Sequence, residues 1–178
     1  FGEREGLLFV GGFAHPPNAD AVLWFAREIF PLIRRELPDV KFYVAGSKVT
    51  DEIKALEETE SGIIIKGFVS EEELAQLYGQ CRVVVVPLRY GAGVKGKVVE
   101  AIYNGAPIVT TSTGAEGIPF VESVLEIADE PEAVADRVAE LYNDNGRCQE
   151  LCRRTQDYIR KNFSMDGAWK VIDEDFRV

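Results

Sequence analysis

Hydrophobic and polar positions divide this chain into two kinds of segment that alternate. Short apolar runs, which are typical of buried strands, occur at 7–12, 41–46, 62–69, 83–87, 107–111 and 124–128. The run VVVVP at 83–87 is apolar on both faces, and this predicts a central strand of a parallel sheet.

Between these runs, apolar residues recur at helical spacing. Helices are predicted over 16–37, 51–58, 70–81, 96–104, 131–143, 147–162 and 166–176. In the first helix we expect Asn18 or Asp20 to act as the N-cap and Pro31 to kink or divide the helix. Ser70 and Glu73 have the spacing of a capping box at the start of the third.

The regular alternation of strands and helices predicts an α/β fold, a Rossmann-like parallel sheet of about six strands with helices on both faces. Ligands of such sheets bind beyond the carboxyl ends of the strands. The loops after the first, third, fourth and fifth strands therefore form the candidate site. The stretch 111–120, rich in glycine and small residues, reads as linker-like, and we place it inside this site.

The net charge of the chain limits the kinds of partner that it is expected to bind. Apolar residues make up 46% of the 178 residues, which is enough for a packed core, and the formal net charge is −10. Such an acidic chain argues against a nucleic acid or an anionic membrane surface as the main partner. Any phosphate-binding site must therefore be locally basic. No apolar run approaches the ~18 residues of a membrane span.

Cysteine and histidine usage favours no metal site. The chain has three cysteines and one histidine, a usage typical of reduced thiols in a cytoplasmic protein. Cys148, Cys152 and His15 do not supply the four close ligands of a structural zinc ion. No signal peptide is visible, and because the chain begins at Phe1 we expect it to be part of a longer protein.

Glycines after the fourth predicted strand match a dinucleotide-binding pattern only in their spacing. Gly91, Gly93 and Gly96 spell G-x-G-x-x-G. In a dinucleotide site the first glycine ends its strand and an acidic residue closes the next one. Here 87–90 intervene, and the next strand ends in 110–112, which are Thr, Thr and Ser. The pattern therefore disfavours a nicotinamide or flavin site.

A phosphate group fits the same loop better. The glycines allow backbone amides to approach a ligand at a helix N-terminus, which is a natural anion site. Arg89, Lys95 and Lys97 place three cations around it in an otherwise acidic chain. Glu100, one turn into the helix, is positioned to bond diol hydroxyls. The alternatives are a solvated basic loop, and a Glu100 that only pairs with Lys97 or favours the helix N-terminus.

These residues resemble a known family. The pattern P-L-R-x-G-x-G-x-K-x-K-x-x-E-A-x-x-x-G-x-P-I-V-T-T-x-x-G-x-E-G at 87–117 is similar to the donor-binding domain of GT-B glycosyltransferases of family 4 (group 1). The segments FVGGF and IKGFVSEEELAQLY extend the resemblance over nearly the whole chain. The resemblance implies transfer of a sugar from a nucleotide diphosphate sugar, with retention of configuration and without a metal or other cofactor.

The resemblance also implies roles for individual residues. Glu100 would bond the ribose hydroxyls. The other residues implied in donor binding lie in three loops: Gly11 and Gly12 near the diphosphate, Lys66, Gly67 and Phe68 around the base, and Gly91, Gly93, Val94 and Lys95 facing the pyrophosphate and sugar.

Two departures from the family pattern change the expected source of charge. A carboxylate that usually touches the donor sugar, eight positions before Glu100, is replaced by Ala92. An Arg and a Lys that grip the diphosphate from the first loop are replaced by Gly12 and Asn18. We infer that Arg89 and Lys97 replace the lost cations from the opposite loop and stabilise the β-phosphate in the reaction.

The resemblance thus identifies residues 1–178 as a single nucleotide-sugar-binding domain, a fragment lacking the N-terminal domain that holds a sugar or glycan acceptor. The donor is expected to be UDP- or GDP-linked. Polysaccharide synthesis in the cytoplasm, peripheral to the inner membrane face through the missing domain, is the expected setting, and activity of the isolated domain is expected to be weak or absent. The alternatives are a non-catalytic nucleotide-sugar-binding module and a GT-B epimerase or phosphorylase.

Overall fold

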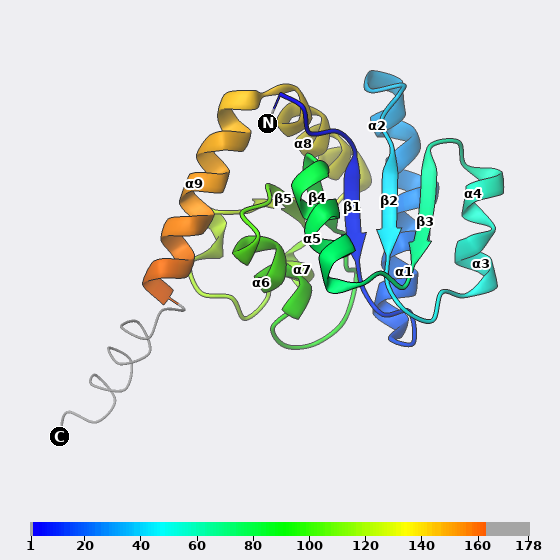
Figure 1. Ribbon diagram of the computed structural model, residues 1–178, viewed down its shortest axis with the longest axis horizontal. Coiled ribbons are helices and arrows are strands. Elements are labelled where there is room, and N and C mark those ends of the chain that lie inside the picture. Colours follow the sequence, from blue (N-terminus) through cyan, green and yellow to red (C-terminus); the bar gives the residue numbers. More distant parts are fainter. Residues whose placement is uncertain (1, 163–178) are drawn as a thin grey trace.

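The computed structural model describes residues 2–162. Its centre is a six-stranded sheet in which neighbouring strands are parallel, in the order β3-β2-β1-β4-β5-β6 (Figure 1). The strands are β1 (Leu7–Val10), β2 (Phe42–Ala45), β3 (Ile63–Gly67), β4 (Val83–Val86), β5 (Ile108–Thr110) and β6 (Glu126–Ile127). The predicted Rossmann-like α/β fold is confirmed.

Helices cover both faces of the sheet. Figure 1 shows α1 (Pro16–Trp24), α2 (Phe30–Glu36) and α8 (Pro131–Asn143) on one face, with α5 (Glu71–Gln80) and α6 (Gly96–Tyr103) on the other. The remaining α-helices of the described residues are α3 (Asp51–Lys54) and α4 (Leu56–Thr59) beside β3, α7 (Ser112–Ala115) after β5, and α9 (Asn145–Asn162), which packs on α6 and α8.

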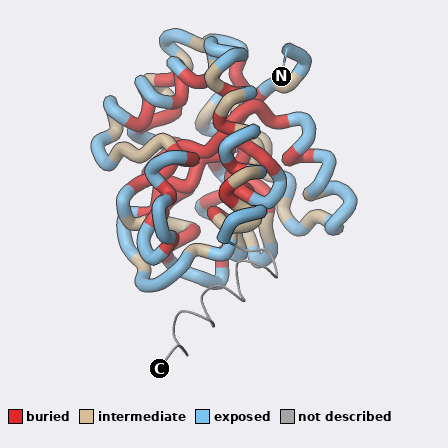
Figure 2. Tube along the Cα trace, turned by 90° about the vertical axis from the view of Figure 1, so that its left-hand side faces the viewer, coloured by how far each residue is buried: buried red, intermediate tan, exposed pale blue. Residues whose placement is uncertain are grey.

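The core lies between the sheet and these helices, as the buried path through the middle of Figure 2 shows. All four residues of β4 are buried, which confirms the predicted central strand. A ring cluster joins the first helical segment to the sheet: the centroids of Phe25 and Phe42 are 4.6 Å apart, and those of Phe30 and Phe42 are 5.8 Å apart.

Pro31 divides the first predicted helix as expected. A π-helical turn over Phe25–Ile29 separates α1 from α2, and Pro31 lies in the first turn of α2. Proline has no N–H to donate to the carbonyl four residues earlier, and its ring crowds that carbonyl. The wider π turn accommodates this loss while Phe25 and Ile29 remain buried.

Other predicted elements differ in detail. The helix predicted over 51–58 is broken at Ala55 into α3 and α4. The linker-like stretch 111–120 contains the short helix α7, capped by the Thr111 hydroxyl. The capping box of Ser70 and Glu73 is confirmed, with both of its hydrogen bonds present. The helix predicted over 166–176 lies outside the described residues.

Candidate functional site

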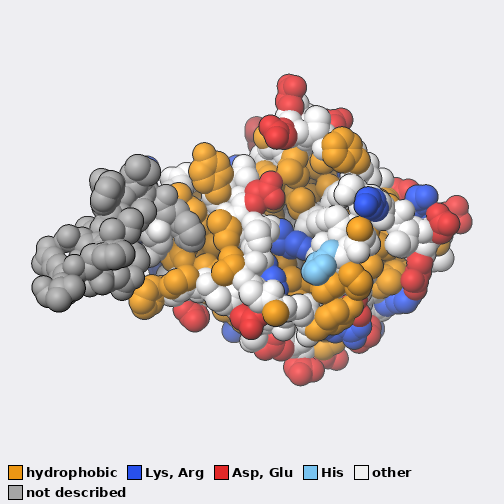
Figure 3. Space-filling view, turned by 90° about the horizontal axis from the view of Figure 1, so that it is seen from below, with side chains coloured by type: hydrophobic (Ala, Val, Ile, Leu, Met, Phe, Trp, Pro, Cys, Tyr) orange, Lys and Arg blue, Asp and Glu red, His pale blue; other side chains and the backbone are white. Residues whose placement is uncertain are grey.

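The strand order reverses between β1 and β4, and this is where the loops after these strands part. A cavity of about 210 Å³ lies between them at the carboxyl ends of the strands. Figure 3 looks onto this end and shows Lys and Arg side chains in a hollow among hydrophobic ones. The cavity is lined by His15, Pro17, Asn18, Leu88, Tyr90, Gly91, Ala92, Val94, Lys95, Gly96 and Lys97. No member of this described lining is acidic, so the cavity is locally basic in an acidic chain.

Backbone contacts fix the loops at this end of the sheet. The amide of Gly11 donates to the carbonyl of Ala45 at 3.0 Å, and the amide of Gly46 donates to that of Gly67 at 2.7 Å. Gly46 has φ +152°, and a Cβ on it would lie 2.7 Å from the carbonyl carbon of Gly11 and closer still to its oxygen. The loops after β1 and β2 therefore approach too closely for a side chain at position 46.

Lys97 extends from the first turn of α6 to the loop after β1. Its Nζ donates to Oδ1 of Asn18, and Nδ2 of Asn18 donates to the carbonyl of Gly12 at 2.7 Å. A Cβ on Gly11 would lie 2.9 Å from the Lys97 Nζ, so glycine leaves the room that this ammonium group occupies. Burial, with a smaller contribution from the neighbouring Lys95, lowers the pKa of Lys97 to about 8.

Asn18 is not the N-cap that the sequence predicted. Helix α1 begins at Pro16, with His15 at the N-cap position and no side-chain cap, because the prolines in the first turn favour an earlier start. The side chain of Asn18 is buried and bridges Lys97 to the first loop instead. Asp20 lies within the helix rather than at its start.

Lys95 uses its ammonium group within its own loop. Nζ donates to the carbonyls of Gly91, at 3.0 Å, and Gly93, and it pairs with Glu116 Oε2 at 3.1 Å. The structure thus separates the two lysines, since Lys97 reaches across the cavity whereas Lys95 closes the loop that lines it.

Arg89 is directed away from the cavity. Its guanidinium group makes a two-pronged ion pair with Asp20 on α1, with Nε 2.9 Å from Oδ2, and lies 5.5 Å from the ring centroid of Trp24. The hydrogen bond to Asp20 raises the pKa of Arg89. The sequence predicted Arg89, together with Lys97, as a β-phosphate ligand. In the structure the charge of Arg89 is already neutralised by Asp20 on α1, and Arg89 is not part of the cavity lining.

Glu100 lies on the other side of the loop, in a second, apolar groove. This groove, of about 580 Å³, is lined by Val94, Gly96, Val99, Glu100, Tyr103 and Ile159, and it shares Val94 and Gly96 with the cavity. Burial raises the pKa of the Glu100 carboxyl, and the nearby hydroxyl of Tyr78 opposes this. That hydroxyl is buried and makes no hydrogen bond of ordinary geometry with the described residues, although it interacts with Glu100.

The residues singled out from the sequence fall into three groups. Gly91, Val94, Lys95 and Lys97 line the cavity, Gly11, Gly12 and Gly93 contact its lining residues, and Lys66, Gly67, Phe68, Arg89 and Glu100 lie outside the lining. Phe68 is 81% exposed beside the positive-φ Gly67, so its ring is open to a ligand at the edge of this face.

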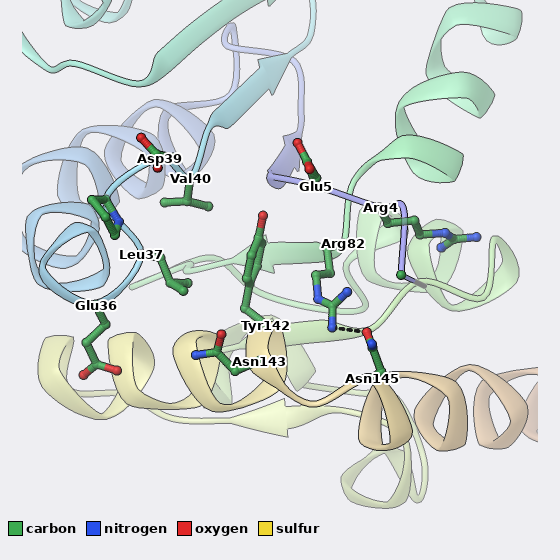
Figure 4. A pocket seen from close by; sticks show the side chains of 12 residues that line it. Arg4, Glu5, Glu36, Leu37, Asp39, Val40, Arg82, Tyr142, Asn143 and Asn145 are labelled. Carbon is green, nitrogen blue, oxygen red and sulfur yellow. Dashed lines mark hydrogen bonds between the residues drawn. The ribbon is translucent and has the colours of Figure 1, made fainter.

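A further cavity lies at the opposite end of the sheet and is less suited to an anion. It has a volume of about 450 Å³ and contains Arg4 and Arg82 together with the carboxylates of Glu5, Glu36 and Asp39 (Figure 4). Arg82 donates to Oδ1 of Asn145 at 2.5 Å. The mixed charges and the position at the amino ends of the strands distinguish this cavity from the candidate site.

Comparison with known families gives a match over most of the chain. Residues 4–144 match the model of the family described as glycosyl transferases group 1. The chain belongs to this family. The group 1 chain is also 29% identical, over 173 residues, to an uncharacterized 44.6 kDa protein in the cps region of Klebsiella pneumoniae. The match covers 93% of this chain and 44% of that relative, so the chain spans less than half of the relative's length.

Solved glycosyltransferase structures share the fold of this group 1 chain. TarM of S. aureus, in complex with Fondaparinux, alpha-GlcNAc-glycerol and UDP, superimposes with a TM-score of 0.77 at 17% identity, over 99% of this chain and 36% of TarM. The pneumococcal O-GlcNAc transferase GtfA, in complex with UDP and GlcNAc, gives 0.67 at 19% identity, over 99% and 37%. Sucrose-phosphate synthase from Thermosynechococcus elongatus gives 0.71 at 17%, over 97% and 45%. No helix within the described part of the group 1 chain is long and apolar enough to cross a membrane.

Proposed function

We propose that this chain is the nucleotide-sugar donor-binding domain of a retaining, metal-independent glycosyltransferase whose N-terminal domain, outside residues 1–178, holds the acceptor. One observation carries the proposal: the ammonium group of Lys97 and the N-terminus of α6 meet in a cavity without carboxylates at the reversal point of the sheet. A doubly charged diphosphate fits this combination.

The N-terminus of α6 is suited to an anion. Lys95 occupies the N-cap position without a side-chain cap, and the first turn contains no acidic residue. The amides of Gly96 and Lys97 therefore keep donors for a ligand, and the helix dipole favours negative charge there. Lys97 adds a full positive charge from the same turn.

The proposed reaction uses these groups on the leaving diphosphate. The bond between the anomeric carbon and the β-phosphate oxygen breaks, and an acceptor hydroxyl bonds to the same carbon from the same face. The acceptor proton passes to the departing phosphate oxygen. Lys97 and the α6 amides stabilise the negative charge that develops on the β-phosphate. No side chain of this domain needs to bond covalently to the sugar.

The comparisons support proposals for the donor nucleotide and for the setting of the reaction. UDP is the first donor nucleotide to test, with GDP second, since the TarM and GtfA structures both contain UDP. The relative in a cps region supports polysaccharide synthesis, which we place in the cytoplasm. No further cofactor is required by this reaction.

A non-catalytic donor-binding module is the second candidate. The observation in its favour is Ala92, which lines the cavity at the position where the family pattern has a carboxylate for the donor sugar. An epimerase is less well supported, because His15 is the one acid–base side chain besides the lysines and Tyr90 in the described lining. A transferase would transfer the sugar to an acceptor, whereas a non-catalytic module would only bind the donor. An assay of sugar transfer by the protein that contains this chain therefore distinguishes the two.

The expected contact between Glu100 and the ribose hydroxyls gives a direct test of donor binding. Replacing Glu100 by Gln keeps the size of the side chain and removes its charge. We expect the affinity for UDP to fall about tenfold, because hydrogen bonds to charged groups are stronger than neutral ones. The affinity for 2′,3′-dideoxy-UDP should change little, since that ligand lacks the hydroxyls that Glu100 would bond. Equal losses for both ligands in calorimetric titrations would remove Glu100 from the ribose site.

Lys97 makes donor binding dependent on pH. Only the ammonium form attracts the diphosphate, and the pKa of Lys97 in the free protein is about 8. Affinity should therefore be constant near pH 7 and fall as the pH rises through about 8, by up to tenfold for each further unit. The measurement is titration with UDP between about pH 7 and 9.5, where the phosphate with its pKa near 6 stays ionised. A flat profile would contradict the assignment of Lys97.

A further inference from the structure

We propose that Lys95 is a positioning residue of the donor site, whose ammonium group holds the glycine loop 91–95 in the shape that presents its amides to the diphosphate, with Glu116 as the partner that anchors it. This inference rests on the proposed function, because it concerns the same cavity. It differs from the sequence-based expectation, in which the positive charge of Lys95 acts on the ligand.

The ammonium group of Lys95 is held by hydrogen bonds to its own loop and to Glu116. An ammonium group has three donors. Those of Lys95 meet three acceptors, the carbonyls of Gly91 and Gly93 and the Glu116 carboxylate. The side chain of Lys95 is 9% exposed, whereas that of Glu116 is 54% exposed. With these donors engaged inside the loop, little of the ammonium group remains to contact a ligand.

The loop needs such a support because its own backbone is permissive. Gly91 has φ +124° and Gly93 has φ +77°, conformations that glycine adopts readily and leaves just as readily. The two carbonyls that accept from Lys95 belong to these same residues. Their bonds to one ammonium group select a single loop shape, which reduces the ordering needed when a ligand binds.

Glu116 lies on a segment that is itself attached to the loop after β4. The hydroxyl of Thr111 donates to the carbonyl of Leu88 at 2.5 Å and accepts from the amide of Gly114 at 3.2 Å. A Cβ on Gly117, next to Glu116, would lie 3.1 Å from Cγ2 of Val94. The loop after β5 therefore packs directly against the glycine loop, and the ion pair of Lys95 joins the two.

The test compares Lys95→Met, Lys95→Arg and Glu116→Gln in the 178-residue chain, with Lys54→Met as the matched control. Lys54 is also a paired lysine, 3.0 Å from Asp51, but it lies on α3 and its side chain is 61% exposed. Two quantities are measured in each variant: the affinity for UDP by calorimetry, and the NMR order parameters of the 91–94 amides in the free protein.

Lys95→Met is expected to lose about tenfold in UDP affinity and to lower the order parameters of 91–94, whereas Lys54→Met changes neither. Glu116→Gln, which keeps an acceptor oxygen, should show smaller changes in the same direction. Lys95→Arg should not restore affinity, because a planar guanidinium group cannot direct its donors to the same three acceptors. Lys95→Arg keeps the positive charge but not the direction of the three hydrogen bonds. The comparison with Lys95→Met therefore distinguishes a role of the hydrogen bonds from a role of the charge.

Wild-type affinity in Lys95→Met or in Lys95→Arg would overturn the positioning role. If the wild-type chain bound no nucleoside diphosphate, the proposed function would fail, and the order parameters would still decide whether Lys95 holds the loop. Unchanged order parameters in Lys95→Met would overturn the inference whatever the ligand.

Discussion

Lys97→Met is expected to weaken nucleoside diphosphate binding by about 10- to 100-fold, the factor that corresponds to losing one hydrogen-bonded charge. Methionine has a similar length and no charge, so the cavity keeps its shape. Asn18 loses the ammonium group that bonds its Oδ1, but its bond to the carbonyl of Gly12 remains. The loss in affinity therefore reports the missing charge.

We expect Lys97→Met to affect the stability of the fold less than it affects the affinity for a nucleoside diphosphate. The pKa of Lys97 is lowered from 10.5 to about 8 in the folded protein, so folding disfavours its charged form at pH 7. Removing the charge removes that cost, which offsets the lost bond to the buried Asn18, so the melting temperature of Lys97→Met should change little. A large drop in melting temperature together with the affinity would mean that the variant damages the fold rather than the site.

Titration of Arg89→Met with the same nucleoside diphosphate distinguishes the roles of Arg89 and Lys97, both of which were predicted from the sequence to bind the β-phosphate. Arg89 pairs with Asp20 in the structure, whereas Lys97 reaches across the cavity. A loss at Arg89→Met as large as that at Lys97→Met would mean that the guanidinium group leaves Asp20 for the diphosphate. Wild-type affinity in Lys97→Met would contradict the relocation of charge to α6.

Gly46→Ala is expected to destabilise the fold by about 3 kcal/mol or more, the sum of backbone strain and a steric clash. The added Cβ would overlap the carbonyl group of Gly11, a backbone atom group that cannot rotate away. Relief requires the loops after β1 and β2 to separate, which also breaks the bond from the Gly11 amide to the Ala45 carbonyl. For a domain of this size the melting temperature should fall by roughly 6–12 °C.

Gly79→Ala is the matched control for this prediction. Gly79 lies in α5, and a Cβ on it would meet no atom within 4 Å. The same substitution there should stabilise the chain by about 0.5–1 kcal/mol, because alanine favours a helix interior. Thermal unfolding of the two variants should therefore shift in opposite directions. Equal melting temperatures would show that the loops after β1 and β2 are free to separate.

Much of the fold could be predicted from the apolar pattern. The run at 83–87 is apolar at successive positions, which suits only a strand covered on both faces, and β4 is such a strand. Pro31 predicted the break in the first helix because the missing N–H acts locally. The N-cap was mispredicted because Asn18 is a good cap by type, whereas Pro16 and Pro17 start the helix earlier.

The candidate site was less predictable, since it depends on contacts between distant residues. The glycine loop and Lys97 were found from local spacing. Nothing local distinguishes Lys97 from Lys95, and their different partners, Asn18 and Glu116, come from other loops. Arg89 looked like a free cation because its partner Asp20 is 69 residues away in the chain. The bridging role of Asn18 had only a weak sequence signal, namely a polar residue beside a glycine-rich loop.

The proposed donor site is tested most directly by a calorimetric titration of the 178-residue chain with UDP, GDP, ADP and NAD, with Lys97→Met as the comparison. We expect saturable binding of one nucleoside diphosphate that is unchanged by EDTA and weakened in Lys97→Met, with no comparable binding of NAD. Tighter binding of NAD than of any nucleoside diphosphate, or nucleoside diphosphate binding that does not depend on Lys97, would contradict a sugar-donor site at the reversal point of the sheet.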